Sequence, residues 1–145
     1  MPSGNVRIQE MLDVLRQWQR IERQSMSDTA EIMEQTENPL IRMIMEIIRH
    51  DSLMHHRVQQ FLVDTITKEN VTITREDVAA IWERVEEHDE LERQTIELAT
   101  ELREKSWTPV HEVLLDYLIV DEKKHDGLLG QLNKVKEGMS RASGA

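Results

Sequence analysis

The residues of this chain best suited to chemistry are three glutamates and two histidines: Glu22, His55, Glu92, Glu122 and His125. Each falls within a stripe of apolar residues at helical spacing, so the pattern predicts that each faces a core near the middle of its helix. Three carboxylates buried together are unfavourable unless protons or a cation compensate their charge. Neutral imidazole is a good ligand for iron, manganese or zinc, so the two histidines favour a bound divalent metal.

These residues belong to an internal repeat with an offset of 70 residues. Glu22 corresponds to Glu92, His55 to His125, and Pro39 to Pro109. Residues 22–62 and 92–132 share 9 identities in 41 pairs, where chance would give roughly two or three. Any two amphipathic hairpins have similar hydrophobic patterns, even without a common origin, and this alone would explain matching leucines. It would not explain matching Glu, Asp and His at fixed distances from a shared proline, so we favour duplication.

Four helices are needed to position these side chains. Hydrophobic periodicity predicts helices over residues 5–37, 39–63, 75–106 and 109–138. Asn38-Pro39 and Thr108-Pro109 separate the helices of each half, because a residue before proline avoids the helical conformation and proline suits the first turn of a helix. Residues 64–75 are rich in β-branched side chains and are expected to be extended. Thr74 has the spacing of a capping box, and 139–145 are expected to form a flexible tail.

The predicted fold is therefore all-α, with one domain over residues 1–145 in which two repeated hairpins form a four-helix bundle. Composition agrees: aromatic residues make up 3% of the chain, and it has 5 Gly and 3 Pro, too few for an all-β fold with many turns.

A Glu in one helix followed by Glu-x-x-His in the next, given twice, resembles the ferritin-like superfamily, and in particular the di-iron carboxylate bundles of the bacterioferritin and rubrerythrin type. Asp121-Glu122-Lys123-Lys124-His125 matches the Asp-Glu-x-x-His string of the bacterioferritin branch. The resemblance covers roughly residues 10–135. It implies iron as the first choice of cofactor, and a crossover between the second and third helices. A simple up-down-up-down bundle, which needs only a short loop at this point, stays open as the alternative topology.

The resemblance also implies a role for each matching residue. The terminal carboxylate ligands would be Glu22 and Glu92, the imidazole ligands His55 and His125, and the bridging carboxylate Glu122. Asp51 and Asp121 would orient the two imidazoles by accepting hydrogen bonds from them.

One residue departs from the family pattern. The second helix has Ser52 where the family has its second bridging Glu, and a hydroxyl is a poor ligand that does not bridge two irons. Five of six ligands remain. The site could hold two metals with water in place of the carboxylate, one metal, or none.

His88 lies on the same face as Glu92, one turn before it, and its repeat partner is Trp18. Two interpretations stay open for His88. It could act beside the metal, or it could be a hydrogen-bonded residue of the core or its rim.

Charge and composition restrict the partners. The chain has 18 basic and 28 acidic residues and a formal net charge of −10, which disfavours nucleic acid and anionic membranes. The absence of Cys excludes disulfides and thiolate sites. With no apolar run of membrane length and no signal-peptide pattern, a cytoplasmic protein is expected.

Three classes of function follow. The first is an oxidoreductase that oxidises Fe(II) or reduces O2 or peroxide. The second binds a metal without turnover, for storage, delivery or sensing. The third is a structural or partner-binding bundle that has lost its metal, and a homo-oligomer is open in each class.

Overall fold

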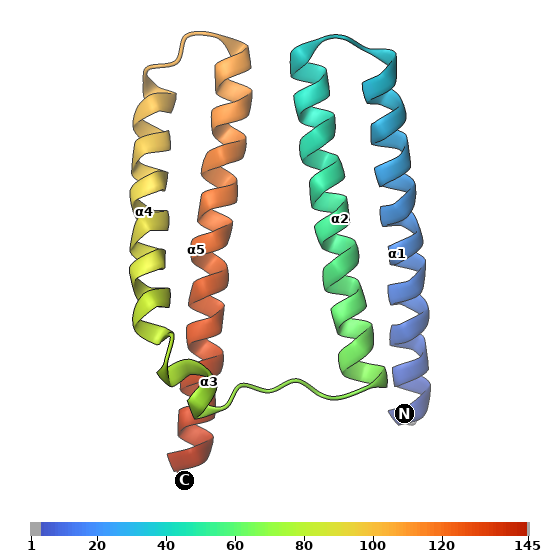
Figure 1. Cartoon of the computed structure of the whole chain (residues 1–145), viewed down its shortest axis with the longest axis vertical. Helices are drawn as coiled ribbons and strands as arrows, with labels where there is room; N and C mark the ends of the chain where they lie inside the picture. Colours follow the sequence, from blue (N-terminus) through green and yellow to red (C-terminus); the bar gives the residue numbers. More distant parts are fainter. Residues whose placement is uncertain (1–3, 145) are drawn as a thin grey trace. The chain divides into compact units, whose positions relative to one another are not determined.

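A computed structural model describes residues 4–144 of the chain, and the side chains of residues 4–138. Every regular element in this range is a helix, as predicted (Figure 1). The helices are α1 (Gly4–Gln35), α2 (Pro39–Thr67), α3 (Arg75–Ala79), α4 (Trp82–Glu104) and α5 (Pro109–Gly144). The chain divides into two compact units, Met1–Val71 and Thr72–Ala145.

The predicted breaks at the two prolines are confirmed, and the same kind of cap begins both following helices. Asn38 Oδ1 accepts hydrogen bonds from the backbone N–H of Leu40 (3.0 Å) and Ile41 (3.1 Å), with Pro39 in the first turn. In the second unit, Thr108 Oγ1 accepts from the backbone N–H of His111 at 3.2 Å. These side chains satisfy backbone donors that have no partner within the helix.

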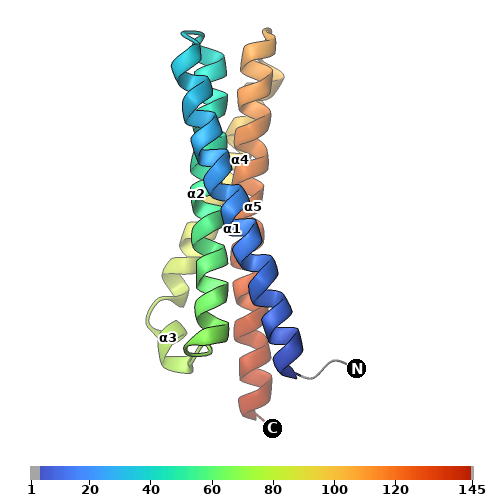
Figure 2. The same cartoon turned by 90° about the vertical axis from the view of Figure 1, so that its right-hand side faces the viewer.

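The first unit is a hairpin of α1 and α2, which lie side by side in both views (Figures 1 and 2). A single seam of residues is buried between the two helices, at the spacing that keeps one helix face toward its neighbour. It contains apolar and polar side chains together. The buried residues are Leu12, Leu15, Gln19, Glu22 and Thr29 of α1 and Ser52, Gln59 and Val63 of α2.

The second unit contains α3 and a hairpin of α4 and α5. The predicted capping box begins α3: Thr74 N donates to Asp77 Oδ2 (2.8 Å), and Asp77 N donates to Thr74 Oγ1 (3.2 Å). The backbone N–H of Thr74, helped by its hydroxyl, lowers the pKa of the Asp77 carboxyl. Within the hairpin, Glu92 of α4 and Leu115 of α5 are buried.

The predicted continuous helix over 75–106 is wrong, because Ala80 and Ile81 form a turn between α3 and α4. Ile81 is the N-cap of α4 and makes no side-chain capping bond. No proline or glycine marks this position in the sequence. The β-branched Ile81 has a reduced helix propensity, which is the one local feature that favours the break.

The connection between the units is shorter than expected. Helix α2 continues four residues past Val63 to Thr67, so the non-helical stretch is 68–74 and not 64–75. The crossover stays a prediction, and residues 68–74 are the non-helical chain available for it. At the other end, α5 continues past Gly138 to Gly144, so the expected tail over 139–144 has a helical backbone. Ala145 lies outside the described residues.

The predicted inward stripes are wider than the seam that each hairpin buries. Several apolar residues of these stripes are 40–56% exposed, because two helices can cover only a narrow face of each other. These residues are Trp18, Ile32, Ile48, Leu62, Leu102 and Leu118. Each hairpin therefore presents an apolar flank beside its polar seam. Among the described helices, none combines the length and apolar composition needed to cross a membrane.

Candidate metal centre

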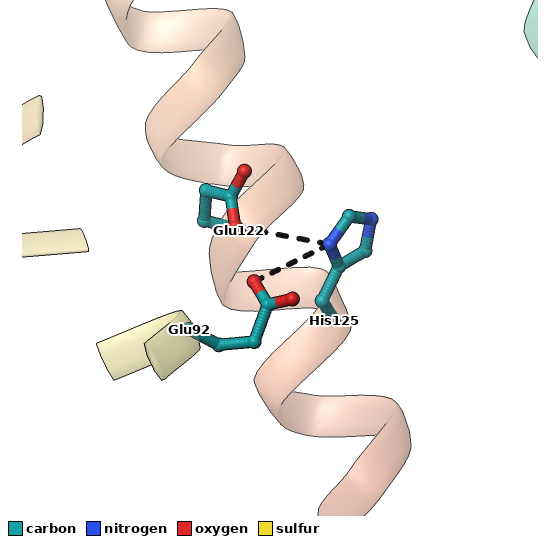
Figure 3. Close-up of side chains that lie close together, drawn as sticks. All are labelled: Glu92, Glu122 and His125. Atoms are coloured by element: carbon teal, nitrogen blue, oxygen red, sulfur yellow. Dashed lines mark ion pairs between the residues drawn. The ribbon is translucent and has the colours of Figure 1, made fainter. Parts of the chain in front are cut away.

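The second unit brings together Glu92 of α4 with Glu122 and His125 of α5 (Figure 3). One ligand atom from each of the three lies within 4.8 Å of the others. His125 Nδ1 is 3.4 Å from Glu92 Oε2 and 3.8 Å from Glu122 Oε2. Glu122 and His125 are three residues apart and project from one face of α5, while the neighbouring helix supplies Glu92.

Glu92 is the most enclosed member of this group. The residue is 8% exposed, and its Oε2 is buried with no hydrogen-bond partner among the described residues. A buried carboxylate oxygen without a donor is costly, and a cation at this position would compensate it. Two carboxylates and an imidazole are a suitable donor set for a divalent transition metal.

The carboxyl groups of Glu92 and Glu122 lie close enough that each shifts the pKa of the other. The hydrogen bond with Glu92 raises the pKa of the Glu122 carboxyl, and burial adds to this. The same hydrogen bond lowers the pKa of Glu92, with the charge of His125 in support. A proton and a metal ion would therefore compete for the pair, because both neutralise the same repulsion.

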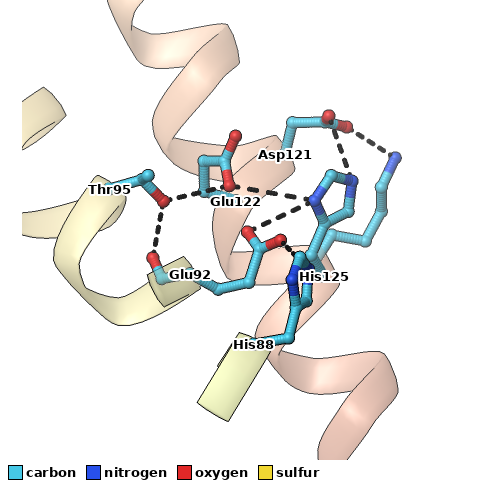
Figure 4. A network of polar contacts seen from close by, with 7 residues as sticks. His88, Glu92, Thr95, Asp121, Glu122 and His125 are labelled. Atoms are coloured by element: carbon cyan, nitrogen blue, oxygen red, sulfur yellow. Dashed lines mark hydrogen bonds and ion pairs between the residues drawn. The ribbon is translucent and has the colours of Figure 1, made fainter. Parts of the chain in front are cut away.

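Neighbouring side chains hold the group in place (Figure 4). His88 Nε2 lies 2.9 Å from Glu92 Oε1. The Thr95 hydroxyl lies 2.7 Å from the Glu92 carbonyl oxygen and 3.1 Å from Glu122 Oε2, and its single proton can serve either. Asp121 Oδ2 is 3.4 Å from His125 Nε2, so the two side chains are near each other, and the role of Asp121 in orienting the imidazole stays a prediction.

The first unit contains the corresponding residues with one ligand fewer. Glu22 is 7% exposed, and its Oε1 lies 3.4 Å from His55 Nδ1 and accepts a hydrogen bond from Trp18 Nε1 at 3.1 Å. Ser52 is 5% exposed, and its hydroxyl lies 2.8 Å from that of Ser25. Among the described residues, no hydrogen bond or ion pair joins Asp51 to His55, so Asp51 does not take the place that Asp121 has in the other unit.

The two units repeat their contacts as well as their residues. Four side-chain pairs of the first unit recur in the second at the offset of 70, which matching hydrophobicity alone would not produce. The pairs Glu22–His55, Trp18–Glu22, Ser25–Ser52 and Arg23–His56 correspond to Glu92–His125, His88–Glu92, Thr95–Glu122 and Arg93–Asp126. These matched contacts support duplication of one helical hairpin.

The structure also shows a polar group that our sequence analysis missed. Arg93 pairs with Asp89 (3.0 Å) and with Asp126 (3.6 Å). The hydrogen bond with Asp126, followed by burial, raises the pKa of the Asp89 carboxyl. The spacing in the sequence could have indicated this cluster, since Asp89 lies three residues before Glu92 and Asp126 four residues after Glu122, which places each on the same helix face as that glutamate. This cluster of Asp89, Arg93 and Asp126 therefore extends the polar contacts between α4 and α5 one turn beyond Glu92, Glu122 and His125.

Comparisons of the chain with family models, with curated proteins and with solved structures gave no match.

Proposed function

We propose that this protein binds a divalent transition metal through Glu92, Glu122 and His125. The observation that supports this most directly is the buried Glu92 Oε2, which has no hydrogen-bond partner in the part of the chain that the structure describes and lies near a second carboxylate and an imidazole. Iron is the first choice, by resemblance to the ferritin-like bundles, and manganese or zinc suit the same donors. A bound metal of this kind supplies Lewis acidity, and iron or manganese also supplies one-electron redox chemistry.

We further propose that the two hairpins assemble into a ferritin-like four-helix bundle, which would add Glu22 and His55 to the site. The apolar flank beside each polar seam supports this, because exposed side chains such as Trp18 (49%) and Leu118 (44%) need cover. The repeated contacts around Glu22 and Glu92 also support it, since in such a bundle each hairpin would supply one half of a pseudo-symmetric site.

Because Ser52 replaces a carboxylate in the first unit, we expect the second unit to bind a metal more tightly than the first. The second unit offers two carboxylates and an imidazole, whereas the first offers one of each and a hydroxyl. We therefore propose one tightly bound metal per chain and a second that binds weakly or not at all. Oxidation of Fe(II) or reduction of O2 or peroxide depends on the second metal. With one metal, storage, delivery or sensing is the favoured role.

The test is metal analysis of untagged protein, followed by calorimetric titration with Zn2+ or Mn2+, or with Fe2+ without oxygen. We expect a stoichiometry near one, and Glu92→Gln should abolish the tight binding. Glu97→Gln is the matched control, because Glu97 lies on the same helix and is exposed. If the wild type binds none of these metals, the chain is a structural or partner-binding bundle and the proposed function is wrong.

Subsequent addition of Fe2+ in air separates the two metal-binding classes. An oxidation band with about two irons per chain would indicate an oxidoreductase. One tight metal without turnover would indicate a binding protein.

A further inference from the structure

His88 differs from its counterpart in the repeat in a way that matters for a metal. In the first unit, Trp18 donates its indole N–H to Glu22 Oε1 at 3.1 Å. In the second unit, His88 Nε2 lies 2.9 Å from Glu92 Oε1, from the equivalent position one turn earlier. An indole nitrogen can only donate a hydrogen bond, whereas a neutral imidazole has a lone pair that can bind a metal.

The distance from each imidazole to Glu92 is one that two ligands of the same metal would have, although His88 lies outside the group of Glu92, Glu122 and His125 whose atoms are all within 4.8 Å of one another. Ligand atoms about 2.1 Å from a metal lie roughly 3.0–3.4 Å from each other at octahedral to tetrahedral angles. His88 Nε2 is 2.9 Å from Glu92 Oε1, and His125 Nδ1 is 3.4 Å from Glu92 Oε2. The two imidazoles therefore approach different oxygens of one carboxylate, as they would around a metal that Glu92 binds through both oxygens.

His88 is also free to adjust its position. Its side chain is 61% exposed, and among the described residues Glu92 is the partner that the structure gives its ring. To join Glu92, Glu122 and His125 around a metal, the His88 ring must turn toward them, and the exposure of its side chain leaves room for that movement.

We propose that His88 is a fourth ligand, so that the second unit holds a complete two-histidine, two-carboxylate site between α4 and α5. This inference rests on the proposed metal binding by Glu92, Glu122 and His125. It adds that one hairpin supplies the full ligand set for a single metal, and that the imidazole of His88 stands where the other hairpin has the indole of Trp18.

The test exchanges His88 for residues that keep the hydrogen bond and remove the metal-binding nitrogen. His88→Trp copies the residue of the first unit, and His88→Gln offers an amide N–H to Glu92. The probes are Zn2+ for affinity and Co2+ for its visible absorption, which depends on the number and type of ligands. His50→Trp is the control, since His50 lies 3.9 Å from a glutamate one turn away on α2 and is 69% exposed.

If His88 is a ligand, both substitutions should weaken metal binding by about 100-fold or more, beyond the ~10–100-fold that a lost outer hydrogen bond typically costs. The Co2+ absorption should also change in position and intensity, while His50→Trp should leave both readouts unchanged. If either folded His88 variant keeps the wild-type affinity and Co2+ spectrum, His88 only supports Glu92 and the inference is wrong.

The same experiment separates this inference from the proposed function. If Glu92→Gln loses metal binding and His88→Trp keeps it in full, the proposed metal site stands and His88 is not one of its ligands. A wild type that binds neither Co2+ nor Zn2+ would overturn both. Far-UV circular dichroism of each variant shows that it is folded, and His88→Gln decides the matter if the larger tryptophan prevents folding.

Discussion

Glu22 and Glu92, which are 70 residues apart, each bury a carboxylate 3.4 Å from the Nδ1 atom of a histidine 33 residues further along the chain. The two units differ at the position occupied by Ser52 in the first and by Glu122 in the second. Ser52 pairs with Ser25 in the first unit, whereas Glu122 contacts Thr95 in the second. The common contacts are those that position a carboxylate beside an imidazole, and the difference is the charge available for a cation.

Glu122→Gln should separate metal binding from stability. Glu122 is held near Glu92, and the raised pKa of its carboxyl shows that its ionised form is disfavoured in the fold. Removing this charge should raise the free energy of unfolding of the metal-free protein at pH 7 by up to about 1 kcal/mol, after allowance for partial exposure. It should also abolish tight metal binding. Urea denaturation in EDTA measures the stability, and calorimetry measures the binding. A metal-free variant less stable than wild type would contradict this account of the carboxyl pair.

The pH dependence of stability should change in Asp89→Asn. The pKa of Asp89 is raised in the folded protein, mainly by its hydrogen bond with Asp126. The folded state therefore holds this proton more tightly than the unfolded state, and its contribution is present at low pH and lost as the pH rises through the raised pKa. Relative to the variant, the wild type should lose stability between the ordinary carboxyl range and neutral pH. Urea denaturation of both metal-free proteins at pH 4.5 and 7 provides the measurement, and an equal difference at the two pH values would refute the prediction.

Ile21→Asp tests assembly of the proposed bundle. Ile21 is 60% exposed and lies beside Glu22 on the apolar flank of α1. If this flank is covered in the bundle, the substitution should lower the free energy of unfolding by about 2 kcal/mol or more. Val120→Asp is the control, because Val120 is 65% exposed and lies on the face of α5 opposite Glu122. Val120→Asp should change the free energy of unfolding by only about 0.5 kcal/mol. Equal small effects in both variants would indicate that the flank of α1 stays uncovered.

The features that the sequence predicted correctly are those set by local chemistry. The helix breaks at Asn38-Pro39 and Thr108-Pro109 could be predicted because a polar side chain before proline satisfies backbone donors whatever the tertiary fold. Burial of Glu22 and Glu92 followed from their place in a periodic stripe.

The features that were missed depend on which neighbour packs against a helix. Periodicity placed Trp18 and His88 on inward faces, yet both are exposed and act through their ring nitrogens on the glutamate one turn away. The seam between two helices is narrower than the apolar stripe, and the sequence alone does not show where the seam falls within it. The turn at Ile81 had no glycine or proline to reveal it.

Ser52→Glu should restore to the first unit the carboxylate that the second unit has at Glu122. Ser52 is 5% exposed and its hydroxyl lies 2.8 Å from Ser25, so a carboxylate here could accept a hydrogen bond from Ser25 as Glu122 does from Thr95. Burying this charge beside Glu22 should cost the metal-free protein about 1–3 kcal/mol. A divalent metal should recover the loss, because it neutralises both carboxylates.

The effect of Ser52→Glu on stability should therefore depend on whether a metal is present. In EDTA, Ser52→Glu should melt at a lower temperature than wild type, and with excess Zn2+ or Mn2+ the difference should disappear or reverse. Calorimetric titration should show the stoichiometry rising from about one toward two. Ser52→Gln, which has nearly the same shape without the charge, should show neither the metal-dependent recovery nor the second binding event. Two equally tight sites in wild type, or no gain in Ser52→Glu over Ser52→Gln, would show that Ser52 is not what limits the first half of the site.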